Sequence, residues 1–415
     1  MGVELSLWQF SLEHCWGAAA LVVWISANAA QAQPLTLDAA LQTAFANNPD
    51  LAAAQWEIDI AQGGRQQAGL IPNPVASWDA EDTRRNSRTT SIKLSQTLEL
   101  GGKRGARIEV ATRAQDAAAL TLEQRRNQLR AEVIDSYYGA LRAQERLDLA
   151  QRSMTLAERG LVVANGRVTA GKSSPVEATR AQVQVSQIRL ELNRAQIGLT
   201  DAYRRLATST GSAATDFQAV ATPSTSVPAL PAAAPLLARL EQTAELRLAE
   251  LSIVQNEASV GLEKAQRIPD LDVSIGSQYD ASVRERVNLV GVSMPIPLFN
   301  RNQGNILAAT RRADQARDLR NAAELRLRTE TRQALDLWQT ANTEVRAFNQ
   351  QILPAAQSAV DSATRGFEMG KFNFLDVLDA QRTLIAARTQ YLAATAQATE
   401  AWVRIERIYG DLARF

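Results

Sequence analysis

The most constraining feature of this sequence is an internal duplication. Landmarks in the first half return in the second at an almost constant offset of 197–199 residues. The recurring pairs are Pro72 and Pro269, Ala111-Thr112-Arg113 and Ala309-Thr310-Arg311, Gly171-Lys172 and Gly370-Lys371, and Ala181-Gln182 and Ala380-Gln381. A fixed offset over so long a stretch indicates that each half carries the same structural unit.

The duplication gives a domain plan. We expect a signal peptide at 1–32, a first repeat at 33–215, a linker at 216–235 and a second repeat at 236–415. The linker is predicted from four prolines among Ala, Ser and Thr. Each repeat reads as a helix, a β-hairpin and a long helical hairpin. The β-hairpins are predicted at about 74–100 and 270–298, and the helical hairpins at about 103–210 and 301–410.

The final helix of each repeat has a seven-residue period. Apolar and small residues form a pair of rows three residues apart, typical of a coiled-coil seam. In the second repeat these rows are Val377, Leu384, Tyr391, Ala398 and Ile405, and Ala380, Ala387, Ala394, Ala401 and Ile408. The helix before the corresponding seam in the first repeat, 103–165, would be on the order of 90 Å long. Heptads alone would also suit a structural coiled coil.

Period-two segments lie between the helices. Apolar residues alternate with polar ones at 91–100 and 288–298, and a partner segment precedes each, at 74–80 and 271–279. The pattern predicts two hairpins with one apolar and one polar face. Since four strands cannot close a barrel and open edges are costly in lipid, membrane-spanning hairpins would need strands from several chains. Two soluble hairpins on a helical bundle are the alternative.

The N-terminus reads as an export signal. An apolar run at 16–25 is followed by Ala30-Gln31-Ala32, a plausible cleavage site, although the first residues lack Lys and Arg. Cys15 precedes the apolar run instead of following it, which argues against a lipid anchor. Cleavage after Ala32 would remove both Cys15 and His14, which are the only cysteine and the only histidine of the chain.

A mature chain without thiolate or imidazole cannot build the usual zinc, copper or iron site, and it cannot use Ser-His-Asp or Cys-His catalysis. We therefore expect no cofactor, no bound metal and no enzymatic activity. The net charge of +1 gives no reason to expect nucleic acid as a partner. Residues 166–173 fit the letters of a P-loop, but a long helix precedes them where a P-loop needs a strand.

Three segments carry a resemblance to a known family. They are 95–104 (SQTLELGGKR), 295–304 (PIPLFNRNQG) and 370–381 (GKFNFLDVLDAQ). Together with the duplication, they make the chain resemble the TolC-like outer-membrane efflux proteins. Within these it looks most like the outer-membrane component of cobalt–zinc–cadmium and related heavy-metal resistance pumps.

The resemblance implies a fold, a location and partners. The fold is mainly α with a membrane β-barrel portion: a homotrimer shares a barrel of twelve strands and continues as a helical tunnel into the periplasm. The implied partners are a periplasmic adaptor, an inner-membrane proton-driven transporter and outer-membrane lipid. The helical tips that would meet the adaptor include Arg167, Gly171, Lys172, Gly370 and Lys371.

The family also narrows its tunnel with acidic rings near the tips. The matching residues are Asp376 and Asp379, with Glu177 in the first repeat, where Arg180 replaces the second acid. Rings of carboxylates favour cations, although exposed acids are also ordinary on a solvated face. The sequence thus predicts an efflux exit duct, with heavy-metal cations as cargo. The alternatives are the same duct for organic compounds or secreted polypeptides, and a periplasmic adaptor or structural coiled coil.

Overall fold

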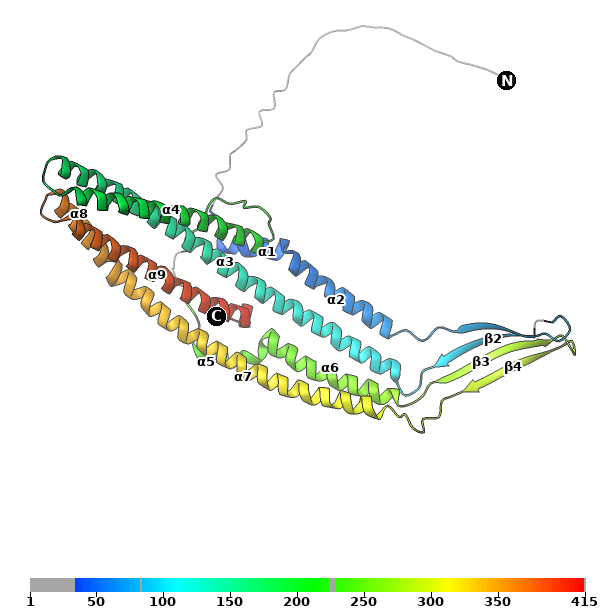
Figure 1. Ribbon diagram of the computed structural model, residues 1–415. Coiled ribbons are helices and arrows are strands. Elements are labelled where there is room, and N and C mark those ends of the chain that lie inside the picture. The colour runs from blue at the N-terminus through cyan, green and yellow to red at the C-terminus, as the bar shows by residue number, and fades with distance from the viewer. Residues whose placement is uncertain (1–33, 83, 224–228, 414–415) are drawn as a thin grey trace, which may run out of the picture. The chain divides into compact units, whose positions relative to one another are not determined.

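The computed structural model describes residues 34–82, 84–223 and 229–413, and the predicted signal peptide lies outside these ranges. The first repeat contains α1 (Leu37–Asn47), α2 (Pro49–Ala68), β1 (Val75–Glu81), β2 (Thr89–Leu98), α3 (Lys103–Thr169) and α4 (Pro175–Ser209). The second contains α6 (Ala244–Gln266), β3 (Leu271–Asp280), β4 (Glu285–Ser293), α7 (Gln303–Ala347), α8 (Leu353–Glu368) and α9 (Phe374–Tyr409) (Figure 1). The predicted order of helix, hairpin and helical hairpin therefore occurs twice.

Local chemistry sets several boundaries. Pro49 and Pro175 open α2 and α4, where a missing N–H costs nothing. Asn48 and Ser174 cap these helices by accepting hydrogen bonds from backbone N–H groups of their first turns. α3 has 67 residues, so at about 1.5 Å per residue it runs on the order of 100 Å.

The four strands form one antiparallel sheet in the order β1-β2-β3-β4. The two hairpins meet through β2 and β3, where Leu94 pairs with Ile275. The register keeps apolar residues on one face, as in the row Ala76, Leu94, Ile275 and Val290. This face is exposed in the single chain: Trp78 is 66% exposed and Val290 79%. β1 and β4 are the sheet's two outer strands, and in this chain each pairs on one side only.

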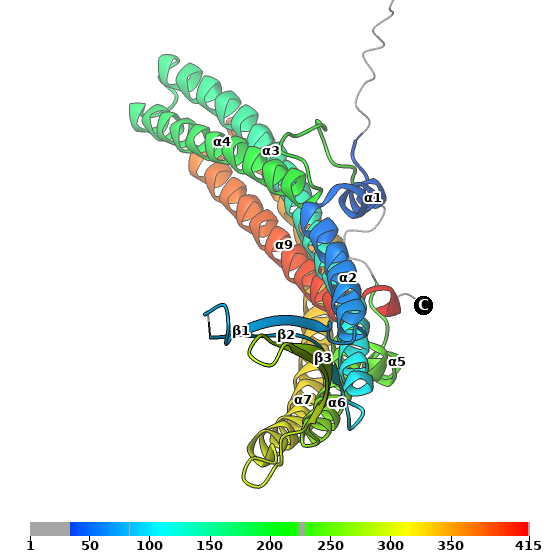
Figure 2. The ribbon, with the colours of Figure 1, turned by 90° about the vertical axis from the view of Figure 1, so that its right-hand side faces the viewer.

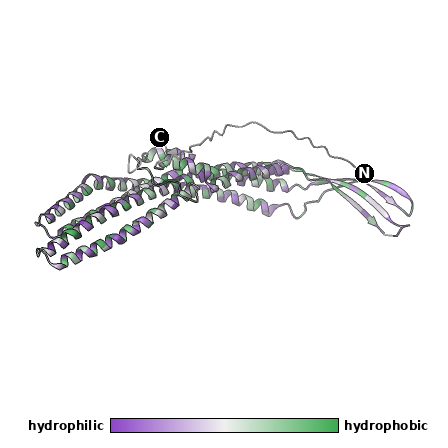
Figure 3. Ribbon diagram, turned by 90° about the horizontal axis from the view of Figure 1, so that it is seen from above, coloured by the Kyte–Doolittle hydropathy of each residue, from purple (hydrophilic) through white to green (hydrophobic). Residues whose placement is uncertain are grey.

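The helices form two further layers. In the sheet-side helical layer, contacts run in the order α2-α3-α6-α7, and in the tip-side helical layer they run α4-α3-α9-α8. Figures 1 and 2 show α4 beside the tip-side half of α3. Both α3 and α7 contact helices of both layers, since α7 packs against α6 and against α9. Hydrophobic and hydrophilic residues are interspersed along the length of the helices (Figure 3). One buried cluster joins α1, α3 and α4 around Val133, Tyr137 and Leu206.

The structure departs from the predicted elements in three places. β4 ends at Ser293, although apolar alternation continues to Leu298, because Pro295 and Pro297 have no N–H for a sheet ladder. A π-helical segment, Phe348–Ile352, interrupts the second helical hairpin just before Pro354. A proline ring clashes with the preceding helical turn, and a π-bulge relieves that clash. The end of the predicted linker forms a short helix, α5 (Ala233–Ala238).

Over the described residues, no helix combines the length and the apolar content needed to cross a bilayer.

Candidate functional site

The two helical tips end in the same turn. Gly171 and Gly370 adopt left-handed backbone angles, with φ of 67° and 75°. Lys172 donates its N–H to the carbonyl of Arg167 at 2.8 Å, and Lys371 donates to Gly366 at 2.8 Å. This is the Schellman arrangement, which ends a helix by satisfying its last carbonyls. A long helix thus leads directly into 166–173, without the strand and phosphate-binding loop that a P-loop requires.

The tips of the two repeats are joined to each other. Arg167 Nη1 donates to the carbonyl oxygens of Phe367 at 3.2 Å and Phe372 at 3.4 Å. Its guanidinium carbon lies 4.8 Å from the ring centroid of buried Phe367, a cation–π distance. A buried cluster beneath it contains residues from α3, α4, α8 and α9, including Ala164, Ala181 and Val377. The tips of the two helical hairpins therefore lie side by side, at the same level along the helices.

The predicted acidic residues lie just inside this joined tip. Glu177 and Asp376 both occupy the third position of their helices, where a carboxylate is stabilised by the helix dipole. Asp376 also completes a capping box, because its carboxylate accepts the Asn373 N–H at 2.9 Å. Asp379 lies one turn further along α9 and is exposed, as is Asp376. Glu177 is half-buried, and its Oε2 has no hydrogen-bond partner among the described residues.

The predicted adaptor-contacting residues differ in exposure. Gly171, Lys172, Gly370 and Lys371 are exposed at the turns. Arg167 is half-buried by its contacts with Phe367 and Phe372. Sequence reasoning grouped Arg167 with the exposed tip residues and missed its position between the two repeats.

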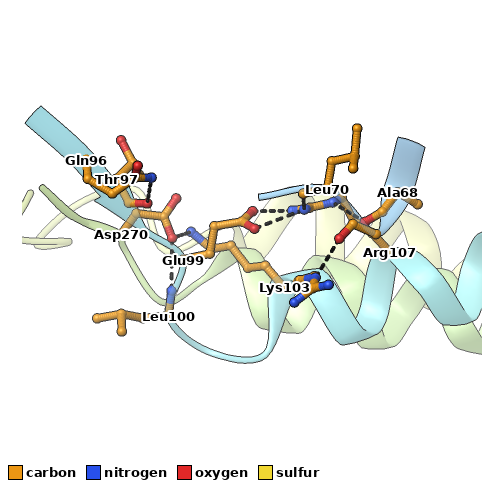
Figure 4. A network of polar contacts seen from close by, with 11 residues as sticks. Ala68, Leu70, Gln96, Thr97, Glu99, Leu100, Lys103, Arg107 and Asp270 are labelled. Carbon is orange, nitrogen blue, oxygen red and sulfur yellow. Dashed lines mark hydrogen bonds and ion pairs between the residues drawn. The ribbon is translucent and has the colours of Figure 1, made fainter. Parts of the chain in front are cut away.

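A second polar cluster lies where the sheet meets the helices (Figure 4). Asp270 accepts hydrogen bonds from Lys103 Nζ at 2.7 Å and from the Leu100 N–H at 3.2 Å. Glu99 and Arg107 form a two-point ion pair, and Arg107 also donates to the Leu70 carbonyl at 3.2 Å. The hydrogen bond from Arg107 lowers the pKa of Glu99 below its ordinary value. We call these four charged residues the junction cluster.

Gly101 makes the junction possible. Its φ is +71°, and a Cβ at this position would lie 2.8 Å from Ile268 Cβ and 2.9 Å from the Ala265 carbonyl oxygen. Only glycine avoids both the strained angle and the collision. Glu99 and Lys103 lie within the segment 95–104 that carried the family resemblance, and Arg107 follows it closely. The sequence pattern did not reveal that Lys103 pairs with Asp270 of the second repeat.

Two open grooves run along α3 in the tip-side layer. The groove between α3, α8 and α9 has a volume of about 1100 Å³ and is lined by residues of both charges, such as Asp148, Arg152 and Arg365. Glu145 lines this groove, and Arg142 lines the second groove, which lies between α3, α4 and α9. Burial raises the pKa of Glu145 and lowers the pKa of Arg142. Among the residues that the structure describes, no three His, Cys, Asp or Glu side chains are grouped to hold a metal ion.

Comparison with known proteins assigns the family. The family model described as "Outer membrane efflux protein" matches residues 40–212 and 238–411. This chain belongs to the outer membrane efflux protein family. It is accordingly an outer-membrane channel of an efflux system whose helices extend into the periplasm, as the resemblance implied.

Individual relatives agree with this assignment. The chain is 40% identical to the cobalt-zinc-cadmium resistance protein CzcC of Cupriavidus metallidurans over 91% of both chains. It is 29% identical to the nickel-cobalt-cadmium resistance protein NccC of Alcaligenes xylosoxydans xylosoxydans, over 73% of this chain and 70% of that one. The crystal structure of CusC superposes with a TM-score of 0.76 at 21% identity, covering 92% of this chain and 93% of CusC. The predicted fold class is confirmed.

Proposed function

We propose that three copies of this chain close into one passive duct that releases divalent heavy-metal cations, of the cobalt, zinc and cadmium type, outside the cell. A periplasmic adaptor docks at the helical tips, and an inner-membrane proton-driven transporter supplies the cations. The chain acts as a conduit and not as an enzyme.

The observation that carries the proposal is the sheet with two outer strands and an exposed apolar face. A lone four-stranded sheet in lipid would leave the backbone groups of β1 and β4 without partners, at a cost of several kcal/mol for each group. Pairing β1 of one copy with β4 of the next removes both edges. The row from Ala76 to Val290 then faces lipid, and the opposite face, which carries Lys93 and Asp272, faces water.

The helical layers support the same closure. Each layer is four elements wide, and its outer members carry exposed apolar residues. On α2, Trp56 is 66% exposed and Ile60 65%; on α7, Leu307 is 57% exposed. One flank of the chain therefore consists of β1, α2 and α4, and the other of β4, α7 and α8. Contacts between unlike flanks close into a ring when the rotation between copies is an exact fraction of a turn.

The relatives' names support a metal cargo. CzcC is named for cobalt, zinc and cadmium resistance, and NccC for nickel, cobalt and cadmium resistance. The conduit itself requires no metal-binding site, since a wide, water-filled passage need not bind what crosses it. Selection among metals then belongs to the inner-membrane transporter.

The acidic residues near the tips supply a preference for cations. Three-fold symmetry would turn each of Asp376 and Asp379 into a ring of three carboxylates, with Glu177 at the matching position of the first repeat. The exposed turn residues Gly171, Lys172, Gly370 and Lys371 offer the surface for the adaptor.

Growth of a deletion strain tests the cargo. The strain is plated on graded cobalt, zinc, cadmium, nickel and copper, beside a panel of detergents and antibiotics. We expect sensitivity confined to particular metals, restored by the wild-type gene. Sensitivity confined to organic compounds would keep the duct and reject the metal cargo.

A further inference from the structure

Exposed arginines gather at the outer end of the sheet, where the hairpin turns lie away from the helices (Figure 1). Arg84, one of them, forms an ion pair with Asp82 at 2.8 Å. None of the others forms an ion pair with a residue that the structure describes. We call these others the outer arginines: Arg85, Arg88, Arg284 and Arg286. Their charges are available to a partner outside the chain.

Strand geometry places two of the outer arginines on the apolar face of the sheet. Side chains on one face of a strand recur at every second residue. In β4 this alternation leads from Val290 to Arg286, and in β2 it leads from Leu94 to Arg88. The Arg88 carbonyl accepts the Ala281 N–H at 3.0 Å, so the ladder continues to this level. Elsewhere on this face, the described strands carry no charged residue.

The carboxylates of the outer end lie on the opposite face. Glu81, Asp280 and Glu285 share one row of the sheet with Thr89, and Asp280 is directly opposite Glu285. In the duct proposed above, on which this inference rests, that face meets water and the apolar face meets lipid. The backbone therefore separates these acids from the arginines on the lipid-facing side.

The level of these arginines matches the outer boundary of the hydrocarbon. Trp78 and Tyr279 are exposed on the apolar face, and Tyr279 is directly opposite Arg286. Such aromatic residues concentrate where a membrane meets water. Along β2, Arg88 lies ten residues from Leu98, which is roughly 33 Å along a strand. At the strand tilt of barrels this becomes about 25 Å across the membrane, the height of their apolar band.

We propose that Arg88 and Arg286 bind the phosphate groups of a phosphorylated glycolipid in the outer leaflet of the outer membrane. Because the helices extend into the periplasm, the hairpin turns reach the outer leaflet. A guanidinium donates two parallel hydrogen bonds to a phosphate, and low-dielectric surroundings strengthen them. Arg85 and Arg284 add positive charge from the adjacent turns. A lipid held in this way fixes the depth of the sheet in the membrane.

Lipid binding by the full chain, purified from outer membranes as its oligomer and delipidated in detergent, tests the proposal. The probes are diphosphorylated lipid A and the same lipid without phosphates. The test variant combines Arg88→Gln with Arg286→Gln. The matched control combines Arg84→Gln with Lys93→Gln, which removes the same charge from the ion-paired arginine and from the water-facing side. Native mass spectrometry measures bound lipid, and light scattering measures the oligomeric state.

We expect the test variant to bind diphosphorylated lipid A at least about tenfold more weakly than the wild type, because two charge-assisted contacts are lost. The control should bind like the wild type. The lipid without phosphates should bind the wild-type chain as weakly as diphosphorylated lipid A binds the test variant.

Equal affinity of the test variant and the wild type, or binding that does not depend on the phosphates, would overturn the arginine site. Displacement of the lipid by equimolar inorganic phosphate would assign the arginines to a soluble anion and overturn the lipid. In both cases an oligomer recovered from outer membranes leaves the duct intact. Recovery of the wild-type chain only as a monomer would overturn the duct, and the lipid site with it.

Discussion

The guanidinium of Arg167 in the first repeat lies 3.2 Å from the carbonyl oxygen of Phe367 in the second, across 200 residues of sequence. This contact, with the Phe367 ring beneath the same guanidinium, joins the ends of two hairpins that otherwise end in separate turns. Since the tips are the narrow, adaptor-facing end in the proposed duct, a bond between them restrains how far that end opens.

Replacing Arg167 with Ala should loosen the tips. The change removes a hydrogen bond and a cation–π contact, together worth about 1–2 kcal/mol. We expect larger and noisier single-channel currents from the reconstituted trimer. Lys172→Ala is the matched control, because it removes the same charge from an exposed position on the same tip. Equal currents from both variants would argue that Arg167 does not restrain opening.

Asp379→Asn should weaken the cation preference of the channel, because it neutralises an exposed carboxylate ring without touching a helix cap. Asp376→Asn should do the same and also cost roughly 0.5–1 kcal/mol in stability, because Asp376 belongs to a capping box. Reversal potentials in a salt gradient measure the preference. Asp201→Asn, at the far end of α4, serves as control. An unchanged reversal potential in Asp379→Asn would remove this residue from the constriction.

A lysine on the apolar face of the sheet should block insertion. Ile275 lies near the middle of β3 on that face, so Ile275→Lys should cost about 2–4 kcal/mol per chain in the bilayer. Ser274→Lys places the same charge on the opposite face, which already carries Lys93, and should be tolerated. The fraction recovered from outer membranes as a heat-modifiable oligomer is the measurement. Equal recovery of both variants would contradict the assignment of the two faces.

The junction cluster predicts a particular dependence on pH. Arg107 holds the pKa of Glu99 below its ordinary value, so the ion pair stabilises the folded state most above that ordinary pKa. Glu99→Gln should lower the free energy of unfolding by about 1 kcal/mol at neutral pH. The deficit should shrink as pH falls below the ordinary glutamate pKa, and vanish once the pH has passed the lowered pKa of Glu99 in the folded chain.

Thermal unfolding in detergent, followed by circular dichroism, gives these differences. Glu109→Gln is the control, since Glu109 pairs with Arg113 at an exposed site on the same helix and should change little at any pH. A Glu99→Gln deficit that persists unchanged in acid would mean that the residue acts through packing and not through its charge.

The sequence predicted the order of elements well because the fold is periodic. The heptad pattern and the two-residue alternation occur in both halves, so an element that is ambiguous in one half can be assigned from its counterpart in the other. Prediction failed where one residue type overrides a period: the alternation continued through Pro295 and Pro297, where no ladder can form. It also missed the π-segment before Pro354, since one extra residue in a helix leaves little trace in composition.

The candidate site was less predictable for a different reason. The acids and turn glycines were assigned by the resemblance to a known family, and their roles in the duct stay predictions. Two contacts join the repeats, Arg167 with Phe367 and Lys103 with Asp270. The periodic pattern within one repeat does not specify which residues of the other repeat it contacts.

In the proposed assembly, copies of this chain close into one water-filled duct. Planar-bilayer recording of the oligomer purified from outer membranes tests it most directly, with the particle mass measured on the same sample. We expect a particle of three chains that conducts in steady single-channel steps and favours cations. A particle of that mass without conductance, or a monomer recovered from the soluble periplasmic fraction, would contradict it.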